Sequence, residues 1–115
     1  MTEQERKDLE MVKQNGFDLK YVKNQTETVC LEAVKQNGYA LQYVKNQTEE
    51  ICLAAVIQDG WALDYVINQT ERVCLEALKQ VPTGRLMQFI DNNTIYFDIT
   101  YYKVLDEYIN NPFLF

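Results

Sequence analysis

The stretch Thr48–Gln69, TEEICLAAVIQDGWALDYVINQ, decides the fold because closely similar units precede and follow it at a spacing of 22 residues. The glycines and cysteines recur at this spacing, as Gly16, Gly38 and Gly60 and as Cys30, Cys52 and Cys74. A fixed period of about 20 to 50 residues is typical of repeat architectures. The sequence therefore predicts a protein built from repeated units.

The first part of each unit predicts a helix of about ten residues. Glu49–Gln58 contains neither Gly nor Pro and is rich in helix formers. One face of this helix is apolar, formed by Ile51, Cys52, Ala55 and Val56. Gly60 follows Asp59, and Gly accepts the left-handed conformation that closes a helix just past its end. We therefore expect the Gly of each unit to end the long helix.

The second part of each unit, Trp61–Ile67 in the quoted copy, predicts a shorter helix of about one and a half to two turns. A strand is the alternative, although Ala-Leu-Asp and Ala-Leu-Gln are poor strand formers. Isolated helices below about 12 to 15 residues are marginal in water, so each helical hairpin needs to stack on the next. The sequence thus predicts an all-α fold, an α-solenoid of 22-residue helical hairpins with a divergent C-terminal cap.

The expected organisation is a single repeat domain that spans residues 1–115. Its parts are an N-terminal capping helix, three repeat units, a degenerate repeat and a C-terminal cap, at residues 1–15, 16–80, 81–94 and 95–115. Lys7 and Asp8 replace Val29 and Cys30 of the next unit. Such polar residues are expected on a helix face that has no preceding neighbour.

The C-terminal cap departs from the repeat and leaves its secondary structure open. A terminal helix that ends before Pro112 is one interpretation, because Pro cannot continue a helix. The alternation of residue types in Thr94–Thr100 also permits a strand.

The pattern of a helix followed by Asn/Asp-Gly-x-Ala-Leu-x-x-Val and a polar turn resembles a short helical-repeat family of unknown function. That family is abundant in mimivirus-like giant viruses and occurs in some amoebae and bacteria. The resemblance covers residues 5–94. It implies a helical repeat protein, viral in origin, with no established biochemical activity, and it brings no functional residues with it.

Composition excludes the commonest catalytic arrangements. The chain contains no His and no Ser, which removes Ser-His and Cys-His pairs and His metal sites. The formal charge is −6, and no basic segment favours nucleic acid. No apolar run reaches the roughly 20 residues that span a bilayer, and the N-terminus, MTEQERKDLE, lacks the apolar core of a signal peptide. We expect a soluble, intracellular protein, in the host cytoplasm if viral, that is not an enzyme and has no cofactor.

The cysteines and aromatic residues are the first candidates for a site. We interpret the cysteines as core residues, because no two of them are two to four residues apart as in zinc sites. Aromatic residues form two rows at the repeat period, namely Phe17, Tyr39 and Trp61, and Tyr21, Tyr43, Tyr65 and Phe89. The favoured interpretation is that these rings wedge between adjacent hairpins. The alternative is an exposed ladder that binds a single-stranded nucleic acid with lysines such as Lys23 and Lys45.

The middle unit carries Ile57 and Ile67 where the equivalent positions of other units have lysine. These two residues are candidate binding residues together with Trp61, Tyr39 and Phe17, and local packing is the alternative. We expect a non-catalytic interaction or scaffold module with an unidentified protein partner. Single-stranded nucleic-acid binding is one alternative. The other is a structural, self-assembling protein, a homo-oligomer through the C-terminal end at residues 111–115.

Each unit also contains the motif NQTE, first at Asn24–Glu27, which matches the acceptor pattern for N-linked glycosylation. Because no secretory route is expected, we interpret the motif as a helix start. Two frames are open: Asn at the N-cap with Glu at N3, or Thr at the N-cap with Glu at the first helical position. We also expect the Asn side chains to hydrogen-bond from unit to unit as a ladder.

Overall fold

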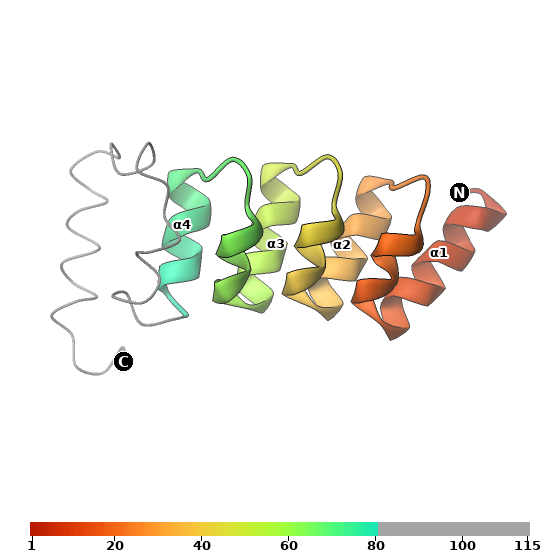
Figure 1. The fold of residues 1–115 in the computed structure, drawn as a ribbon, viewed down its shortest axis with the longest axis horizontal. Coiled ribbons are helices and arrows are strands. Elements are labelled where there is room, and N and C mark those ends of the chain that lie inside the picture. The colour runs from red at the N-terminus through yellow and green to blue at the C-terminus, as the bar shows by residue number, and fades with distance from the viewer. Residues whose placement is uncertain (81–115) are drawn as a thin grey trace, which may run out of the picture.

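The computed structural model describes residues 1–80, which are all-helical and contain no strand. α-Helices alternate with short 3₁₀ helices along this part of the chain. Their bounds are α1 Glu3–Gln14, η1 Gly16–Tyr21, α2 Glu27–Gln36, η2 Gly38–Tyr43, α3 Glu49–Gln58, η3 Gly60–Tyr65 and α4 Glu71–Leu78. The α-helices lie side by side in one row, and the 3₁₀ helices lie in a second row along it (Figure 1).

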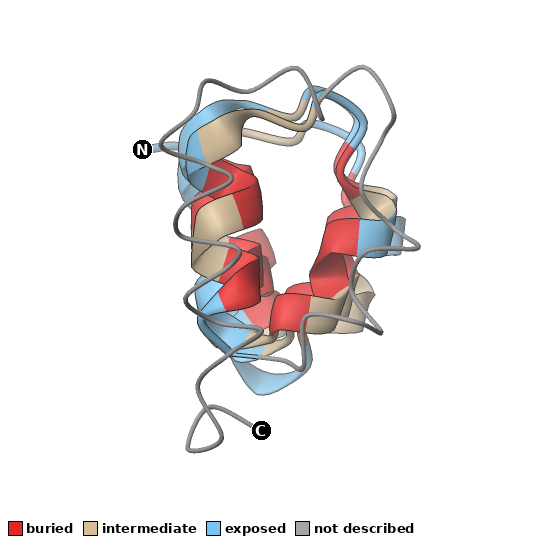
Figure 2. Cartoon of the chain, turned by 90° about the vertical axis from the view of Figure 1, so that its left-hand side faces the viewer, coloured by how far each residue is buried: buried red, intermediate tan, exposed pale blue. Residues whose placement is uncertain are grey.

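The core lies between the two rows. Seen along the array, the buried residues of both rows face each other and the exposed residues lie outside (Figure 2). Leu41 and Leu63 of the 3₁₀ helices and Val34 and Val56 of the α-helices are fully buried. Each α-helix packs against the next α-helix and against the 3₁₀ helices beside it. Helices too short to be stable alone thus bury their apolar faces on their neighbours.

The helix predictions are confirmed, with one change of type. α3 runs from Glu49 to Gln58, the range that the sequence predicts. The second segment is helical, but it is a 3₁₀ helix at Gly60–Tyr65, and the strand alternative is wrong. A side-chain cap fixes its start, because Asp59 Oδ1 accepts a hydrogen bond from the Trp61 backbone N–H at 3.0 Å. The Asn before the Gly of each earlier unit caps η1 and η2 in the same way.

The conformation predicted for the glycines is wrong, since no glycine among residues 1–80 has a positive φ. Gly38 is needed because of close packing. A Cβ atom there would lie 2.6 Å from the Ala55 carbonyl oxygen and 3.0 Å from Gln58 Oε1. A Cβ on Gly16 would meet the Ala33 carbonyl oxygen in the same way. Gly16 and Gly38 therefore set how closely η1 and η2 approach the α-helix that follows each of them.

Thr, and not Asn, is the N-cap of the long helices. The Thr48 hydroxyl accepts a hydrogen bond from the Ile51 backbone N–H at 3.2 Å, and Glu49 is the first residue of α3. Thr26 and Thr70 cap α2 and α4 with the same geometry. The second of the two predicted frames is thus confirmed, with a carboxylate at the positively polarised start of each helix.

The expected Asn ladder is wrong. Within residues 1–80, Asn24, Asn46 and Asn68 are exposed, and no hydrogen bond joins their side chains. The neighbouring Gln makes the connection instead. Gln25 Nε2 donates to the Tyr43 carbonyl at 2.8 Å, and Gln25 Oε1 accepts from the Lys45 backbone N–H at 3.0 Å.

The same connection joins the next pair of turns. Gln47 Nε2 donates to the Tyr65 carbonyl at 2.8 Å, and Gln47 Oε1 accepts from the Ile67 backbone N–H at 2.9 Å. Because both partners are backbone groups, the bond forms whether the following residue is Lys45 or Ile67. Each Gln side chain therefore ties one turn to the next.

Thr and Glu of the motif form a second link between units. The Thr48 hydroxyl donates to Glu27 Oε1 at 3.3 Å, and the Thr70 hydroxyl donates to Glu49 Oε1 at 2.8 Å. Each Thr thus accepts from its own helix and donates to the preceding one. Three of the four residues of NQTE hold the array together, and Asn is the one that does not.

At the N-terminal end, the prediction for Lys7 is confirmed and the reason given for Asp8 is wrong. Lys7 is exposed, with its Nζ 3.8 Å from Glu3 Oε1. Asp8 is only 7% exposed, and its Oδ1 accepts from Gln4 Nε2 at 3.0 Å. Asp8 lies one turn before the buried Val12, so it shares the helix face that packs into the array.

The predicted degenerate repeat at residues 81–94 and the C-terminal cap at residues 95–115 lie outside the described residues, as does the choice between helix and strand at Thr94–Thr100. Within residues 1–80, every helix is too short or too polar to cross a membrane.

Candidate functional site

The candidate aromatic residues lie at the boundaries between units. Phe17 meets Tyr43 of the next unit edge-on, with ring centroids 6.2 Å apart and planes at 87°. Tyr39 meets Tyr65 in the same way, at 5.9 Å and 88°. These four rings and Trp61 are half-buried. One row therefore packs against the other across each boundary, and these rings do not form a continuous stacking surface.

Tyr21 differs from the other rings of its row. It is 66% exposed, because the described residues supply no preceding unit whose ring would meet it edge-on. The Lys20 ammonium lies over this ring, with its Nζ 5.0 Å from the ring centroid. Phe89, the last member of the row, lies outside the described residues.

The structure does not bring Ile57 and Ile67 together. Ile57 lies near the C-terminal end of α3 and is 56% exposed, whereas Ile67 lies in the turn before α4 and is 77% exposed. Ile67 lines a hollow of about 250 Å³ with Thr48 and Glu49, which lie at the opposite end of α3. The two isoleucines therefore belong to separate surfaces.

Ile57 lines a shallow hollow of about 410 Å³ that extends over α2, α3 and α4. Its floor is apolar and consists of Leu31, Leu53, Ala54 and Ile57. We call these four residues the α3 outer surface. Charged residues surround the floor, namely Glu27, Lys35, Glu50 and Arg72. Arg72 Nη1 lies 3.7 Å from Glu50 Oε1, and both side chains are mostly exposed, so this ion pair adds little stability.

The α3 outer surface exists because the middle unit departs from its neighbours at two positions one helical turn apart. Ala54 stands where Glu32 and Glu76 stand, and Ile57 stands where other units have lysine. Sequence reasoning selected Ile57 but missed Ala54, Leu53 and Leu31. The available signal was the spacing of three residues between Ala54 and Ile57, which places both on one helix face.

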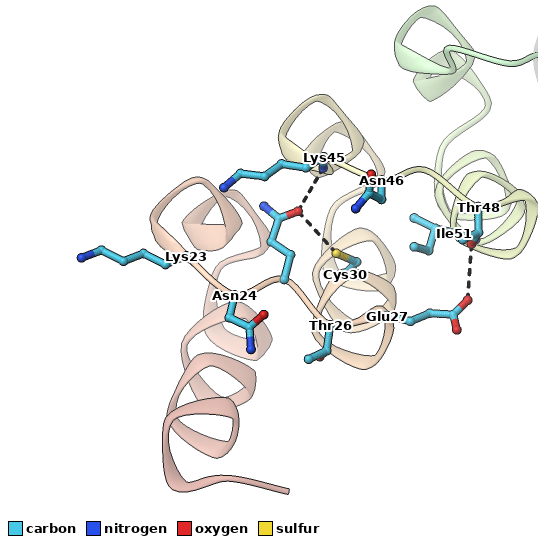
Figure 3. A pocket seen from close by; sticks show the side chains of 10 residues that line it. Lys23, Asn24, Thr26, Glu27, Cys30, Lys45, Asn46, Thr48 and Ile51 are labelled. Atoms are coloured by element: carbon cyan, nitrogen blue, oxygen red, sulfur yellow. Dashed lines mark hydrogen bonds between the residues drawn. The ribbon is translucent and has the colours of Figure 1, made fainter.

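A second set of hollows follows the turns, on the edge of the array formed by the NQTE motifs. One of them, of about 330 Å³, lies between the turns that begin α2 and α3. Figure 3 shows Cys30, Lys45 and Asn46 around it. The Cys30 thiol and the Lys45 backbone N–H both donate to Gln25 Oε1, at 3.7 and 3.0 Å. The Gln25 side chain, which connects the two turns, therefore lies across this hollow.

The cysteines are core residues, as the sequence predicts, and all three thiols are free and buried. Within residues 1–80, no three His, Cys, Asp or Glu side chains gather closely enough to hold a metal ion. Burial raises the pKa of Cys30 and Cys52 to about 11 and that of Cys74 to about 12. Glu27 and Glu49 add a smaller increase at Cys30 and Cys52. The native state thus favours the protonated thiol, which stabilises the fold below pH 9 and loses that effect as the pH rises through about 11.

We expect the native thiols to resist modification at pH 8. A pKa raised by two units lowers the thiolate fraction by about 100-fold, and the thiolate is the reactive form. A chromogenic disulfide reagent should therefore label the native chain at least about 100-fold more slowly than the chain in urea. Labelling of the three cysteines at equal rates in both states would contradict the buried positions of Cys30, Cys52 and Cys74.

Comparison with known proteins gives one match. A family model described as "Domain of unknown function (DUF4116)" matches residues 9–47 and, again, residues 26–70. Together the two matches cover more than half of the 115-residue chain. Neither the curated proteins nor the solved structures include a match.

Proposed function

We propose that this chain, which belongs to the DUF4116 family of unknown function, is an α-solenoid that serves as a non-catalytic protein-interaction or scaffold module. Two observations support the solenoid. The bonds of Gln25 recur at Gln47, 22 residues later, and the same family model aligns with two overlapping stretches. Stacked repeats form extended surfaces, which such proteins use to bind partners. The proposal includes the viral origin that the sequence resemblance implies and the intracellular setting expected from the charged N-terminus.

The observation that carries the proposal is the α3 outer surface. Most helices of a stacked array expose a polar outer face, and α2 and α4 have Glu32 and Glu76 there. α3 instead exposes Ile57 above Leu53 and Ala54, while its inner face is buried in the core. An apolar floor with a charged rim is the usual anatomy of a protein interface.

The shape and charge of this surface indicate the partner's chemistry. Its floor would accept one or two aliphatic or aromatic side chains from a helix or an extended segment. Lys35 and Arg72 lie on opposite sides of Ile57, on α2 and α4, and Glu50 lies beside Arg72. We infer that the partner carries an apolar anchor flanked by charged residues of both signs.

The experiment compares affinity captures from the native cell with the wild-type chain, Ile57→Lys and Ile67→Lys as baits. Ile57→Lys introduces the residue found at the equivalent positions of the neighbouring units, Lys35 and Lys79, so the fold is expected to persist and circular dichroism would verify it. The proposal predicts a protein whose capture falls about tenfold with Ile57→Lys, since a central anchor contributes at least about 1.4 kcal/mol. Ile67→Lys is the matched control and should leave that capture unchanged.

The identified partner would then be purified and its Kd measured against each variant. Equal captures with wild-type and Ile57→Lys baits would reject the α3 outer surface as the binding site. Loss of the partner with both variants would indicate a general effect of added charge and would count against the proposal as well.

The alternatives have less support. Single-stranded nucleic-acid binding needs rings that are free to stack on bases, whereas Phe17 and Tyr39 pack edge-on against Tyr43 and Tyr65. Self-assembly through residues 111–115 concerns a segment outside the described residues.

A further inference from the structure

The turns that precede α3 and α4, at residues 43–45 and 65–67, each form a slot that the Gln side chain of the preceding turn fills. In both, a Gln carboxamide lies between the carbonyl of one residue and the backbone N–H of the residue two positions later. The Cys at the base of the slot donates its thiol hydrogen to the Gln oxygen, at 3.7 Å from Cys30 and 3.4 Å from Cys52. The slot therefore offers one acceptor and two donors, and a carboxamide matches them.

The equivalent slot of the first turn has no Gln. Its backbone groups are the Tyr21 carbonyl and the Lys23 N–H, which correspond to those of Tyr43 and Lys45. The chain before it is already helical from Glu3, so no turn residue reaches the slot. Within residues 1–80, no side chain bonds to either backbone group. What remains is a hollow of about 320 Å³ lined by Gln4, Asp8, Tyr21, Lys23 and Asn24.

The base of this first slot has the opposite hydrogen-bonding character. Asp8 stands where Cys30 and Cys52 stand, so a carboxylate acceptor replaces a thiol donor. Asp8 is 7% exposed, and among residues 1–80 the one side chain that donates a hydrogen bond to its carboxylate is Gln4, from Nε2 to Oδ1 at 3.0 Å. A carboxylate has room for about four hydrogen bonds, so most of its acceptor capacity is unused. A buried carboxylate with a single neutral donor favours a cationic partner.

We propose that this first-turn slot binds the guanidinium group of an arginine side chain. A guanidinium is planar like a carboxamide, but it presents donors on both sides of its fork. One N–H would donate to the Tyr21 carbonyl, where Gln25 donates to Tyr43 in the next slot, and a second would donate to the Asp8 carboxylate, whereas the Lys23 N–H, itself a donor, would gain no bond from the guanidinium. Bonds from guanidinium to carboxylate are charge-assisted and stronger than neutral ones.

Other side chains fit this slot less well. A carboxamide would place its oxygen against the Asp8 carboxylate, and an ammonium group lacks the planar fork that reaches two separate acceptors. Tyr21 lines the same hollow, and its exposed ring would offer an apolar surface to the stem of the arginine. Lys23 also lines the hollow, but this residue is exposed, so its ammonium group can lie in solvent. This slot lies on the edge of the array where the turns are, so the proposed arginine site is independent of the α3 outer surface.

The test is a titration of the isotope-labelled full chain with N-acetyl-arginine amide, followed by the NMR shifts of the Gln4, Asp8 and Lys23 backbone amides. A single small side chain should bind with a Kd on the order of 1 mM. N-acetyl-citrulline amide has the same shape without charge, and N-acetyl-lysine amide has the charge without the fork. Both should bind at least about tenfold more weakly, because the citrulline compound lacks the positive charge and the lysine compound lacks the planar fork of donors.

Two variants of Asp8 distinguish the site from general attraction to an acidic protein. Asp8→Asn keeps the shape, and Asp8→Cys introduces the residue of the other units, so at least one of them should fold normally. Either should weaken arginine binding about tenfold or more, whereas Asp64→Asn, at an exposed carboxylate, should leave it unchanged. Equal affinities for arginine and citrulline, an unchanged affinity in a folded Asp8 variant, or no shifts at 50-fold the expected Kd would each overturn the proposal.

Discussion

Gly38→Ala is expected to destabilise the fold by about 3 kcal/mol, because there is no space for the added methyl group. The new Cβ would lie 2.6 Å from the Ala55 carbonyl oxygen, which belongs to the backbone of α3 and cannot rotate away. It would also lie 3.0 Å from Gln58 Oε1, the atom that accepts a hydrogen bond from the Gly38 N–H at 2.7 Å. η2 and α3 must therefore separate, and the leucine and valine contacts between them are lost.

Urea unfolding followed by circular dichroism would measure this loss. Gln36→Ala is the matched control: this exposed residue lies two positions earlier, and its change should alter the free energy of unfolding by less than about 0.5 kcal/mol. Gly16→Ala should behave like Gly38→Ala, since its Cβ would meet the Ala33 carbonyl. A loss below about 1 kcal/mol for Gly38→Ala would show that the two helices can separate at little cost.

Gln47→Leu is expected to cost about 2 kcal/mol, because it removes the side chain that joins two turns. Leucine keeps the approximate size of glutamine but leaves the Tyr65 carbonyl and the Ile67 N–H without their partner. It also removes the acceptor of the Cys52 thiol. The two backbone groups belong to residues that are at least partly exposed, which limits the cost for each of them, whereas the Cys52 thiol is buried.

The matched control for Gln47→Leu is Asn46→Ala, one residue earlier in the same motif. Asn46 is exposed and makes no hydrogen bond to the other Asn side chains, so the control should change stability by less than about 0.5 kcal/mol. Unfolding in urea, together with hydrogen exchange of the Ile67 amide, would compare the two variants. If both changes lower the free energy of unfolding equally, the hydrogen bonds of Gln47 to the Tyr65 carbonyl and the Ile67 N–H would not be what connects the units.

The sequence predicted the helices well because their signals are local. The apolar face and the absence of Gly and Pro in Glu49–Gln58 define α3 to the residue, and Asp59 before Gly60 marks where it ends. Burial of the cysteines followed from their position on that face. The Thr cap was among the two predicted frames, and only the geometry of the Thr48 hydroxyl distinguishes it from Asn46.

The wrong predictions concern contacts between units, which rules about residues close together in the sequence do not describe. The left-handed Gly was inferred from the commonest helix ending, whereas Gly38 is fixed by the carbonyl of Ala55 in the following helix. The Asn ladder was inferred from periodicity alone, and periodicity cannot tell which of two adjacent amides, Asn46 or Gln47, points along the array. The α3 outer surface was missed in part because Ala54 is unremarkable until it is seen beside Ile57 on one helix face.

The hydrogen bonds of Gln25 and Gln47 to the backbone of the next turn have a consequence for how the length of such a chain can change. Because Gln25 and Gln47 bind backbone groups, their hydrogen bonds do not depend on which side chain the bonded residue carries, as Lys45 and Ile67 demonstrate. A tandem duplication of one 22-residue stretch would therefore carry a complete junction into the new copy. We therefore expect that duplication or loss of a whole 22-residue unit needs no compensating substitution at these bonds, and that exposed positions such as residue 57 are free to diverge.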